Sequence, residues 1–118
     1  MYGITNCSTV KKARTKLESN KVDYEFWDYK KQGIDESHLV SWCDSLGWEK
    51  VLNRSGMMWR KADEVTKNKV VDQATAIEFM LTVPTAIKRP ILESRGKLFL
   101  GYDEAEYKIQ FINSYVKI

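Results

Sequence analysis

Histidine, cysteine and proline, on which many functional sites depend, are scarce in this sequence. The 118 residues contain one histidine (His38), two cysteines (Cys7 and Cys43) and two prolines. A structural zinc site usually takes four closely organised Cys and His ligands, so we expect no metal site. A single histidine without a serine-elbow motif likewise gives no support to a serine-hydrolase triad. Two separated thiols suit a reducing compartment better than a disulfide-stabilised secreted fold.

Long apolar runs and a strong charge imbalance are also missing. No stretch approaches the roughly 18 consecutive apolar residues of a membrane span, and no basic-then-apolar leader opens the sequence. Nineteen Lys and Arg against sixteen Asp and Glu leave a net charge of +3, too small by itself to indicate a nucleic-acid-binding protein. We therefore expect a cytoplasmic protein that has no membrane partner and no direct nucleic-acid partner.

The order of apolar patterns predicts a single α/β domain in three parts. Residues 1–29 have the pattern of a βαβ unit, in which the strand-like segments Met1–Ile4 and Val22–Phe26 flank an amphipathic helix. Residues 30–82 are predicted to form a helical insertion, and residues 83–118 a ββα unit. We therefore expect a small mixed four-stranded sheet with the helical insertion between its two halves.

Helical periodicity predicts which side chains face the core. Asp35 and Gly47 have the character of an N-cap and a C-cap. A further helix is expected to follow Asp72, and a final helix to follow Asp103. The expected inward faces are Val10, Ala13 and Leu17 in the first helix, Leu39, Trp42, Cys43 and Leu46 after Asp35, Ala74, Ile77 and Leu81 after Asp72, and Ala105, Ile109, Ile112 and Val116 after Asp103.

Cys7 lies where the first predicted strand ends and the first helix begins. The first N–H groups of a helix lack partners within the helix, and its N-terminus carries partial positive charge, so a thiolate is favoured there. Lys11 and Lys12 oppose the helix dipole in the first turn, a penalty that an anion at Cys7 would offset. The alternative is that Cys7 is a small buried apolar residue at a strand end. Its position favours a functional thiol.

The residues around Cys7 exclude two thiol chemistries. A phosphatase-type loop needs an arginine six positions after the cysteine, where this sequence has Ala13. A dithiol redox motif needs a second cysteine three positions on, where it has Val10. A disulfide formed by Cys7 must therefore be resolved by an external thiol or by a distant Cys43 brought close by movement. An external low-molecular-weight thiol is the simpler assumption.

Several blocks of the sequence resemble the arsenate reductase (ArsC)-like family, most closely its YffB branch, with the Spx regulators as relatives. The resemblance covers nearly the entire chain in consistent order. It implies a thioredoxin-like fold and a redox role for Cys7. The blocks that carry it are Tyr2-Gly3-Ile4, Asn6-Cys7, Thr9, Lys11-Lys12-Ala13, Leu46-Gly47-Trp48-Glu49, Trp59-Arg60-Lys61 and Ile87-Lys88-Arg89-Pro90-Ile91-Leu92.

The resemblance also assigns roles to residues far from Cys7 in the sequence. Arg60 and Arg89 match two of the three arginines that hold the oxyanion in arsenate reductases, although either could instead form surface ion pairs. The third arginine would fall near Gly101, where there is none. Pro90 resembles the cis-proline that faces the cysteine in thioredoxin-like folds. We expect Cys7 to be catalytic, and expect substrate or glutathione to be bound by Asn6, Thr9, Lys11, Arg60, Arg89 and Pro90.

The resemblance implies a glutathione-dependent thiol–disulfide oxidoreductase that acts on a small thiol or disulfide. Glutathione would then be a co-substrate, with no bound cofactor. Two alternatives are a Spx-like regulator that binds RNA polymerase and an arsenate reductase proper. Val10 removes the dithiol switch of redox-controlled Spx proteins. Val10 also replaces the serine that arsenate reductases place three positions after the cysteine, which counts against arsenate reduction.

Overall fold

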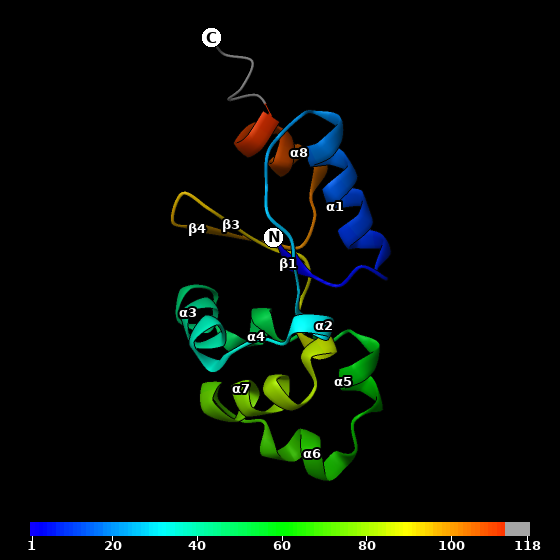
Figure 1. The fold of residues 1–118 in the computed structure, drawn as a ribbon. Helices are drawn as coiled ribbons and strands as arrows, with labels where there is room; N and C mark the ends of the chain where they lie inside the picture. Colours follow the sequence, from blue (N-terminus) through cyan, green and yellow to red (C-terminus); the bar gives the residue numbers. More distant parts are fainter. Residues whose placement is uncertain (113–118) are drawn as a thin grey trace. The chain divides into compact units, whose positions relative to one another are not determined.

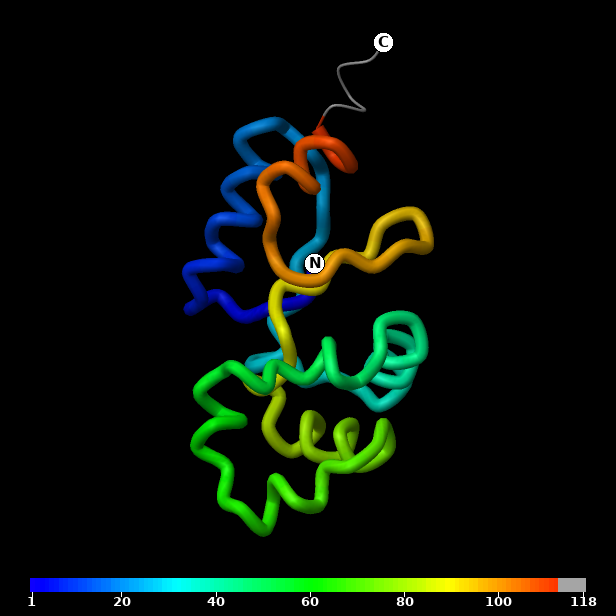
Figure 2. Tube along the Cα trace, turned by 180° about the vertical axis from the view of Figure 1, so that it is seen from behind, coloured from blue at the N-terminus to red at the C-terminus, as the bar shows by residue number. Residues whose placement is uncertain are grey.

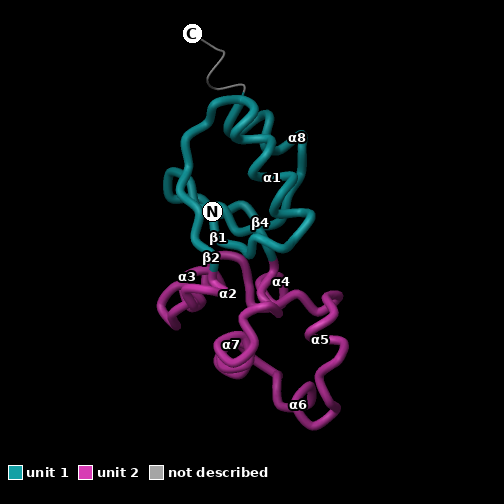
Figure 3. Tube along the Cα trace, turned by 45° about the vertical axis from the view of Figure 1, so that its right-hand side comes forward, with its two compact units in different colours: residues 1–28, 89–118 teal, residues 29–88 magenta. Residues whose placement is uncertain are grey.

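A computed structural model describes residues 1–112 and divides them into two compact units (Figures 1 and 3). Unit 1 combines residues 1–28 with the described residues from Arg89 onward, and unit 2 is Tyr29–Lys88. No helix among the described residues is both long and apolar enough to cross a bilayer. The inward position predicted for Val116 lies outside the described residues.

Unit 1 is built on a four-stranded sheet with the order β2-β1-β3-β4. Strands β1 (Tyr2–Gly3) and β2 (Trp27–Asp28) run parallel. Strand β3 (Ile91–Ser94) is antiparallel both to β1 and to β4 (Lys97–Leu100), with which it forms the hairpin drawn in yellow to orange in Figure 2. The predicted mixed four-stranded sheet is confirmed.

Two helical segments pack on this sheet. Helix α1 (Ser8–Ser19) buries its predicted inward face, and α8 (Glu104–Tyr107) continues into the π-helical turn η2 (Lys108–Ile112). The ammonium group of Lys16 pairs with Glu104 at 3.1 Å and links α1 to α8. The buried side chains that form the core of unit 1 are Met1, Val10, Ala13, Leu17, Leu92, Tyr107 and Phe111.

The close approach of α1 to β1 depends on Gly3. A Cβ atom at Gly3 would lie 3.0 Å from Cγ2 of Val10, which is tighter than ordinary packing allows. Glycine therefore lets the helix lie directly against the strand. Because Val10 is on the first turn of α1, this contact also sets where the helix begins and where Cys7 lies.

The second predicted strand was placed wrongly along the chain. Val22–Phe26 alternates apolar and polar residues, but the ladder with β1 forms at Trp27–Asp28. The reason lies in the partner strand, because β1 begins at Tyr2 and Tyr2 pairs with Trp27. The alternation of Val22–Phe26 still describes an extended segment that turns one side to the core, since Val22, Tyr24 and Phe26 pack against the core of unit 1.

The predicted inward face of the last helix was also wrong in part. Ala105 and Ile109 are exposed, whereas Tyr107, Phe111 and Ile112 are buried. The physical reason is a cluster of edge-to-face aromatic contacts, in which the centre of the Tyr107 ring lies 5.2 Å from the centre of the Phe111 ring. Large aromatic side chains bury more apolar area than Ala and Ile do, so they determine which side of the helix faces the core.

Tyr107 gives a stability prediction. Its hydroxyl is buried and has no hydrogen-bond partner among the described residues, and burial, with the nearby Tyr102, raises the pKa of Tyr107. Because an unsatisfied buried hydroxyl costs free energy, Tyr107→Phe is expected to raise the free energy of unfolding by about 1 kcal/mol in urea titrations. Tyr102→Phe, at a half-buried ring, is the control and should change it less. A loss of stability in Tyr107→Phe would contradict the prediction.

Unit 2 is helical. Its longest helices are α3 (Glu36–Leu46) and α7 (Gln73–Thr82), which are in contact with each other. Asp35 caps α3 by accepting a hydrogen bond from the His38 N–H, and Gly47 ends it, as predicted. The shorter elements are α2 (Tyr29–Gln32), α4 (Trp48–Val51), α5 (Met57–Lys61), α6 (Glu64–Lys69) and the 3-10 turn η1 (Pro84–Ala86).

The core of unit 2 agrees with the predicted face of α3 and differs from that of α7. Leu39, Trp42 and Cys43 are buried, as predicted. In α7, Ala74 and Leu81 are exposed although both were expected to face inward. Six of the ten residues of α7 are apolar and they lie on several sides of the helix, so its sequence does not clearly favour one face. Packing against the neighbouring helices selects Ala76, Ile77 and Met80 as the buried face.

Candidate functional site

Cys7 is the N-cap residue of α1. Its backbone is extended, with φ −148° and ψ 122°, and its carbonyl accepts the Lys11 N–H at 2.9 Å, the first turn of the helix. The side chain is neither fully buried nor fully exposed. The thiol thus lies at the end of the helix where the N–H groups lack partners, and solvent reaches it.

The surroundings of Cys7 favour its ionised form. Burial of the thiol raises its pKa, but the backbone N–H groups of Val10 and Thr9 and the guanidinium of Arg89 outweigh burial, so the pKa of Cys7 lies below the usual value for a thiol. Arg89 acts both through a hydrogen bond and through its charge. No side-chain hydrogen bond of standard geometry caps the helix at Cys7. The N–H groups therefore lower the pKa by stabilising the charged sulfur of the thiolate.

Arg89 reaches Cys7 from the segment that leads into β3. The next residue, Pro90, is buried and joined to Arg89 by a cis peptide bond, in agreement with the resemblance of Pro90 to a cis-proline. The Pro90 carbonyl accepts the Gly101 N–H at 2.8 Å, which attaches this segment to the end of β4. The fold thus brings Arg89, just before β3, and Cys7, at the start of α1, together, although 81 residues lie between them in the sequence.

The other predicted binding residues near the start of α1 are exposed. Asn6 precedes Cys7 in the turn after β1, and Thr9 and Lys11 lie in the first turn of α1. Thr9 contributes to the site through its backbone N–H. Val10 does the same, and its role at the site was missed in the sequence interpretation, which considered only its side chain and not its backbone N–H. The N-cap position of Cys7 is the signal that identifies these N–H groups.

Arg60 belongs to unit 2, where it lies on α5. Its side chain is exposed, and its Nη1 donates to the Ser55 carbonyl at 3.5 Å. The hydrogen bond between these two residues closes the short turn before α5. The role of Arg60 as an anion-binding residue stays a prediction.

Cys43 is chemically unlike Cys7. It is buried on α3, and burial, with the adjacent charge of Asp44, raises the pKa of Cys43 to about 11. At neutral pH this thiol is almost entirely protonated, and the thiolate is the nucleophilic form. Among the described residues there is also no group of three or more His, Cys, Asp or Glu that could hold a metal ion.

The difference between the two cysteines predicts the course of alkylation. With iodoacetamide, the alkylation rate of Cys7 should reach half its maximum at a pH below the usual thiol pKa. The reason is that the pKa of Cys7 is depressed, so the sulfur stays ionised until the pH falls through this lower pKa. Cys43 should remain unmodified at neutral pH, since its pKa is about 11. Peptide mapping of modified protein across a pH series measures both rates. Equal modification of the two cysteines at pH 7 would contradict the prediction.

Comparisons with known proteins show which family and which solved structures this chain is similar to. The model of the ArsC family matches residues 2–110. An uncharacterised protein of Haemophilus influenzae is 38% identical over 111 residues, which cover 94% of this chain and 96% of the relative. A solved YFFB protein is 50% identical, with a TM-score of 0.87 over 92% of this chain and 94% of its own. A solved ArsC-related protein from Brucella melitensis is 44% identical, with a TM-score of 0.73 over 99% and 92%. These structures confirm the predicted thioredoxin-like fold.

Proposed function

Because this chain belongs to the ArsC family, we propose that it is a thiol–disulfide oxidoreductase whose nucleophile is Cys7 and whose reductant is glutathione. The observation that carries the proposal is the depressed pKa of a half-buried thiol held by helix N–H groups and by Arg89. A pKa lowered by a specific charge partner is typical of a reactive cysteine. The other cysteine, Cys43, is buried with a raised pKa, which supports an external source for the second thiol.

The proposed reaction has two exchange steps. In the first, the Cys7 thiolate attacks the glutathione sulfur of a mixed disulfide R–S–S–G. A bond forms between Cys7 and glutathione, and R–S⁻ leaves and takes a proton from water. In the second, a glutathione thiolate attacks the glutathione sulfur of this adduct, which releases glutathione disulfide and restores the Cys7 thiolate. In sum, one glutathione thiol is consumed for each R–S–S–G, the thiol R–SH is released, and the disulfide bond passes to glutathione disulfide.

The residues around the sulfur have distinct parts in this reaction. The N–H groups of Thr9 and Val10 stabilise the thiolate before attack and again when it is the leaving group of the second step. The guanidinium of Arg89 lies beside the sulfur and can hold a carboxylate of glutathione through two parallel hydrogen bonds. This placement would direct the glutathione sulfur toward Cys7. Asn6 and Lys11 are exposed at the same helix start and would contact the rest of the ligand.

Incubation with glutathione disulfide tests the proposal directly. We expect intact-protein mass spectrometry to show one glutathione adduct, peptide mapping to place it on Cys7, and reduced glutathione to remove it. Cys43 serves as an internal control, because its protonated thiol should carry no adduct. Failure to form the adduct on Cys7 at neutral pH, or an adduct that glutathione cannot remove, would contradict the proposal.

Arsenate reduction is a second candidate, favoured by Arg89 beside the Cys7 sulfur, since a guanidinium also holds an oxyanion well. Val10 and Gly101 stand where the family pattern has a serine and a third arginine, so the oxyanion would have fewer ligands. An assay of arsenate with glutathione and glutaredoxin decides between the candidates. Turnover that depends on Cys7 would support arsenate as a substrate.

A further inference from the structure

Unit 2 contains a cavity of about 550 Å³ that is bordered by α5, α6 and α7, the three helices labelled in green in Figure 1. All of its lining residues lie between Met58 and Val83, so the cavity belongs to unit 2 alone. Its volume falls in the range of roughly 300 to 1,000 Å³ that is typical of ligand pockets. The chemistry of the lining therefore indicates which ligand the cavity would take.

Much of the lining is apolar. The four larger apolar side chains in it are Met58, Val70, Phe79 and Val83. Methionine is unbranched and polarizable, so Met58 can adapt its shape to the body of a ligand. A hydrocarbon placed against these side chains would leave water for apolar surroundings, which is favourable. The lining therefore suits a ligand with an apolar body.

Contacts between the helices hold the walls of the cavity in place. The Lys67 ammonium on α6 donates to the Arg60 carbonyl on α5 at 3.2 Å. The rings of Trp59 on α5 and Phe79 on α7 meet edge to face, with their centres 5.4 Å apart. Each of these contacts joins two of the three helices. The cavity is therefore formed before any ligand enters, which lowers the entropy cost of binding.

Most of the polar side chains in the lining already have partners within unit 2. The Thr75 hydroxyl donates to the Asp72 carboxylate at 2.7 Å, as part of the cap that begins α7. The Thr82 hydroxyl donates to a carbonyl of its own helix at 3.1 Å. The Asp63 carboxylate caps α6 by accepting the Thr66 N–H at 2.7 Å, and this N–H, with the Thr66 hydroxyl, lowers the pKa of Asp63. These groups are engaged by the fold and do not select a ligand.

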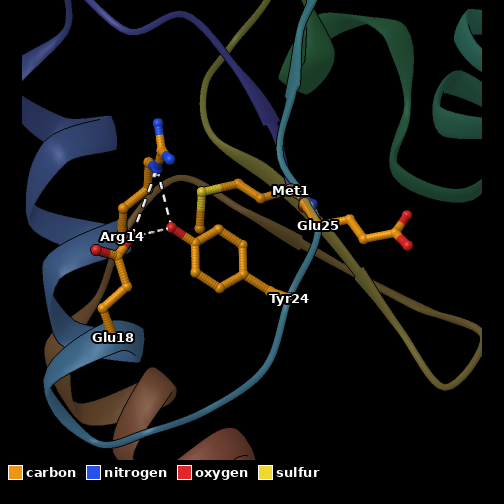
Figure 4. Close-up of polar contacts among 5 residues, drawn as sticks. All are labelled: Met1, Arg14, Glu18, Tyr24 and Glu25. Atoms are coloured by element: carbon orange, nitrogen blue, oxygen red, sulfur yellow. Dashed lines mark hydrogen bonds and ion pairs between the residues drawn. The ribbon is translucent and has the colours of Figure 1, made fainter.

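Three charged groups of the lining are left to meet a ligand. They are the ammonium groups of Lys61 and Lys69 and the carboxylate of Glu78, all on exposed side chains. In the described part of the chain, none of the three side chains forms an ion pair or a hydrogen bond. Arg14 in unit 1 shows the opposite case, because its Nε lies 3.7 Å from a carboxylate oxygen of Glu18 (Figure 4).

The charge around the cavity favours an anion over a cation. Residues 54–71 contain five Lys and Arg and two Asp and Glu, which leaves +3 on this segment. The whole chain also carries +3, so the charges of the remaining residues balance. Within the lining, Asp63 attracts Lys69 and offsets part of its charge, whereas Lys61 has no such partner. An anionic group is therefore attracted to the side of the cavity that carries the two lysines.

We propose that this cavity binds a small amphipathic carboxylate, whose apolar body packs against the four apolar side chains of the lining and whose carboxylate is held by Lys61 and Lys69. The ligand class is that of a medium-chain fatty-acid anion. Glu78 disfavours the carboxylate by repulsion and so limits the affinity. The cavity lies within unit 2 and Cys7 lies in unit 1, so this proposal does not depend on the proposed oxidoreductase activity.

Titration of ¹⁵N-labelled protein with octanoate at neutral pH tests the site. We expect saturable chemical-shift changes in the amides of residues 58–70 and 75–83. Three matched probes separate the parts of the ligand, because 1-octanol lacks the charge, octylammonium reverses it, and acetate lacks the apolar body. Each of them should bind more weakly than octanoate.

Four outcomes of this titration would overturn the proposal. They are equal affinity for octanoate and octylammonium, equal affinity for octanoate and acetate, shifts confined to unit 1, and the absence of saturable shifts. Shifts of the same amides that depend on protein concentration without any probe would assign the cavity to a second copy of this chain. That result would overturn the proposal as well.

Substitutions of the charged lining residues should change the affinity in opposite directions. Lys61→Gln is expected to weaken octanoate binding about threefold, the size of an exposed ion pair, and Glu78→Gln to strengthen it by a similar factor. Lys50→Gln on α4, at an exposed lysine outside the lining, is the matched control and should leave the affinity unchanged. Weaker octanoate binding by Glu78→Gln would show that the cavity does not select an anion.

The two adjacent methionines of α5 give a matched test of the apolar part of the site. Met58 lines the cavity, whereas Met57 does not and is 65% exposed. Met58→Gln is expected to weaken octanoate binding about fourfold, the value of one buried CH₂ group, and Met57→Gln to leave it unchanged. If the two variants bind octanoate equally well, the proposal fails. Cys7→Ser should bind octanoate as the wild type does, so failure of this proposal is distinguishable from failure of the proposed oxidoreductase activity.

Discussion

Replacing Cys7 with serine is expected to reduce turnover of a glutathione mixed disulfide to the background rate of uncatalysed exchange. Cys7 provides a thiol with a depressed pKa at the start of α1. A serine hydroxyl at the same position is neither ionised at neutral pH nor able to form a disulfide. The measurement is the steady-state rate of release of glutathione disulfide, coupled to glutathione reductase, at saturating glutathione.

The second cysteine provides the matched control for this experiment. Cys43→Ser should retain most of the wild-type rate, because Cys43 is buried with a pKa of about 11 and has no part in the proposed reaction. The substitution places a hydroxyl in the core of unit 2, so its folding should be verified by circular dichroism. If Cys43→Ser folds and loses activity, Cys43 acts as a resolving thiol and the external-thiol mechanism is wrong.

Arg89→Gln is expected to raise the pKa of Cys7 and to lower its alkylation rate at pH 7 between roughly three- and tenfold. The guanidinium stabilises the thiolate through a hydrogen bond and through its charge, whereas a glutamine amide keeps a donor and loses the charge. The N–H groups of Val10 and Thr9 remain, so part of the depression of the pKa should remain as well. Iodoacetamide, a neutral reagent, measures the thiolate without contributions from substrate binding.

Two further variants separate charge from geometry at this position. Arg89→Lys keeps the positive charge without the planar guanidinium and should give an intermediate rate. Lys11→Gln removes an exposed positive charge in the first turn of α1 that does not contribute to the pKa of Cys7, so its rate should match that of the wild type. An unchanged inflection in the pH profile of Arg89→Gln would show that Arg89 does not stabilise the thiolate.

Local patterns in the sequence predicted the elements whose structure depends on local interactions. The buried face of α1 and the caps of α3 follow from helical spacing and from the side chain of Asp35, and the structure has both. Elements that depend on a distant partner were predicted less well. Val22–Phe26 has a strand pattern, but where β2 forms is decided by the start of β1. In α7, where most residues are apolar, tertiary packing rather than sequence spacing selected the buried side chains.

In the candidate site, too, the features that depend on neighbouring residues could be predicted, and the contacts with distant residues could not. The position of Cys7 at a helix start could be predicted from the turn residues before it and the spacing after it. That Arg89 lies beside Cys7 could not be predicted from spacing, because the pairing of β1 with β3 brings them together. Only the resemblance to a family identified Arg89 in advance. The contribution of the Val10 N–H was missed because side-chain identity, rather than backbone position, was considered there.

The use of a cysteine as the N-cap of α1 has a thermodynamic consequence for the redox chemistry that we propose for Cys7. The N–H groups and Arg89 interact with a negatively charged sulfur, and a sulfur in a neutral mixed disulfide gains almost none of that stabilisation. Oxidation of Cys7 to the mixed disulfide therefore loses the favourable interactions with the N–H groups and Arg89, and reduction to the thiolate restores them. This asymmetry shifts the reduction potential upward and makes the mixed disulfide an oxidant toward free thiols. In the proposed reaction the adduct would be short-lived in a reducing pool, and the protein would return to its thiolate state without a partner cysteine.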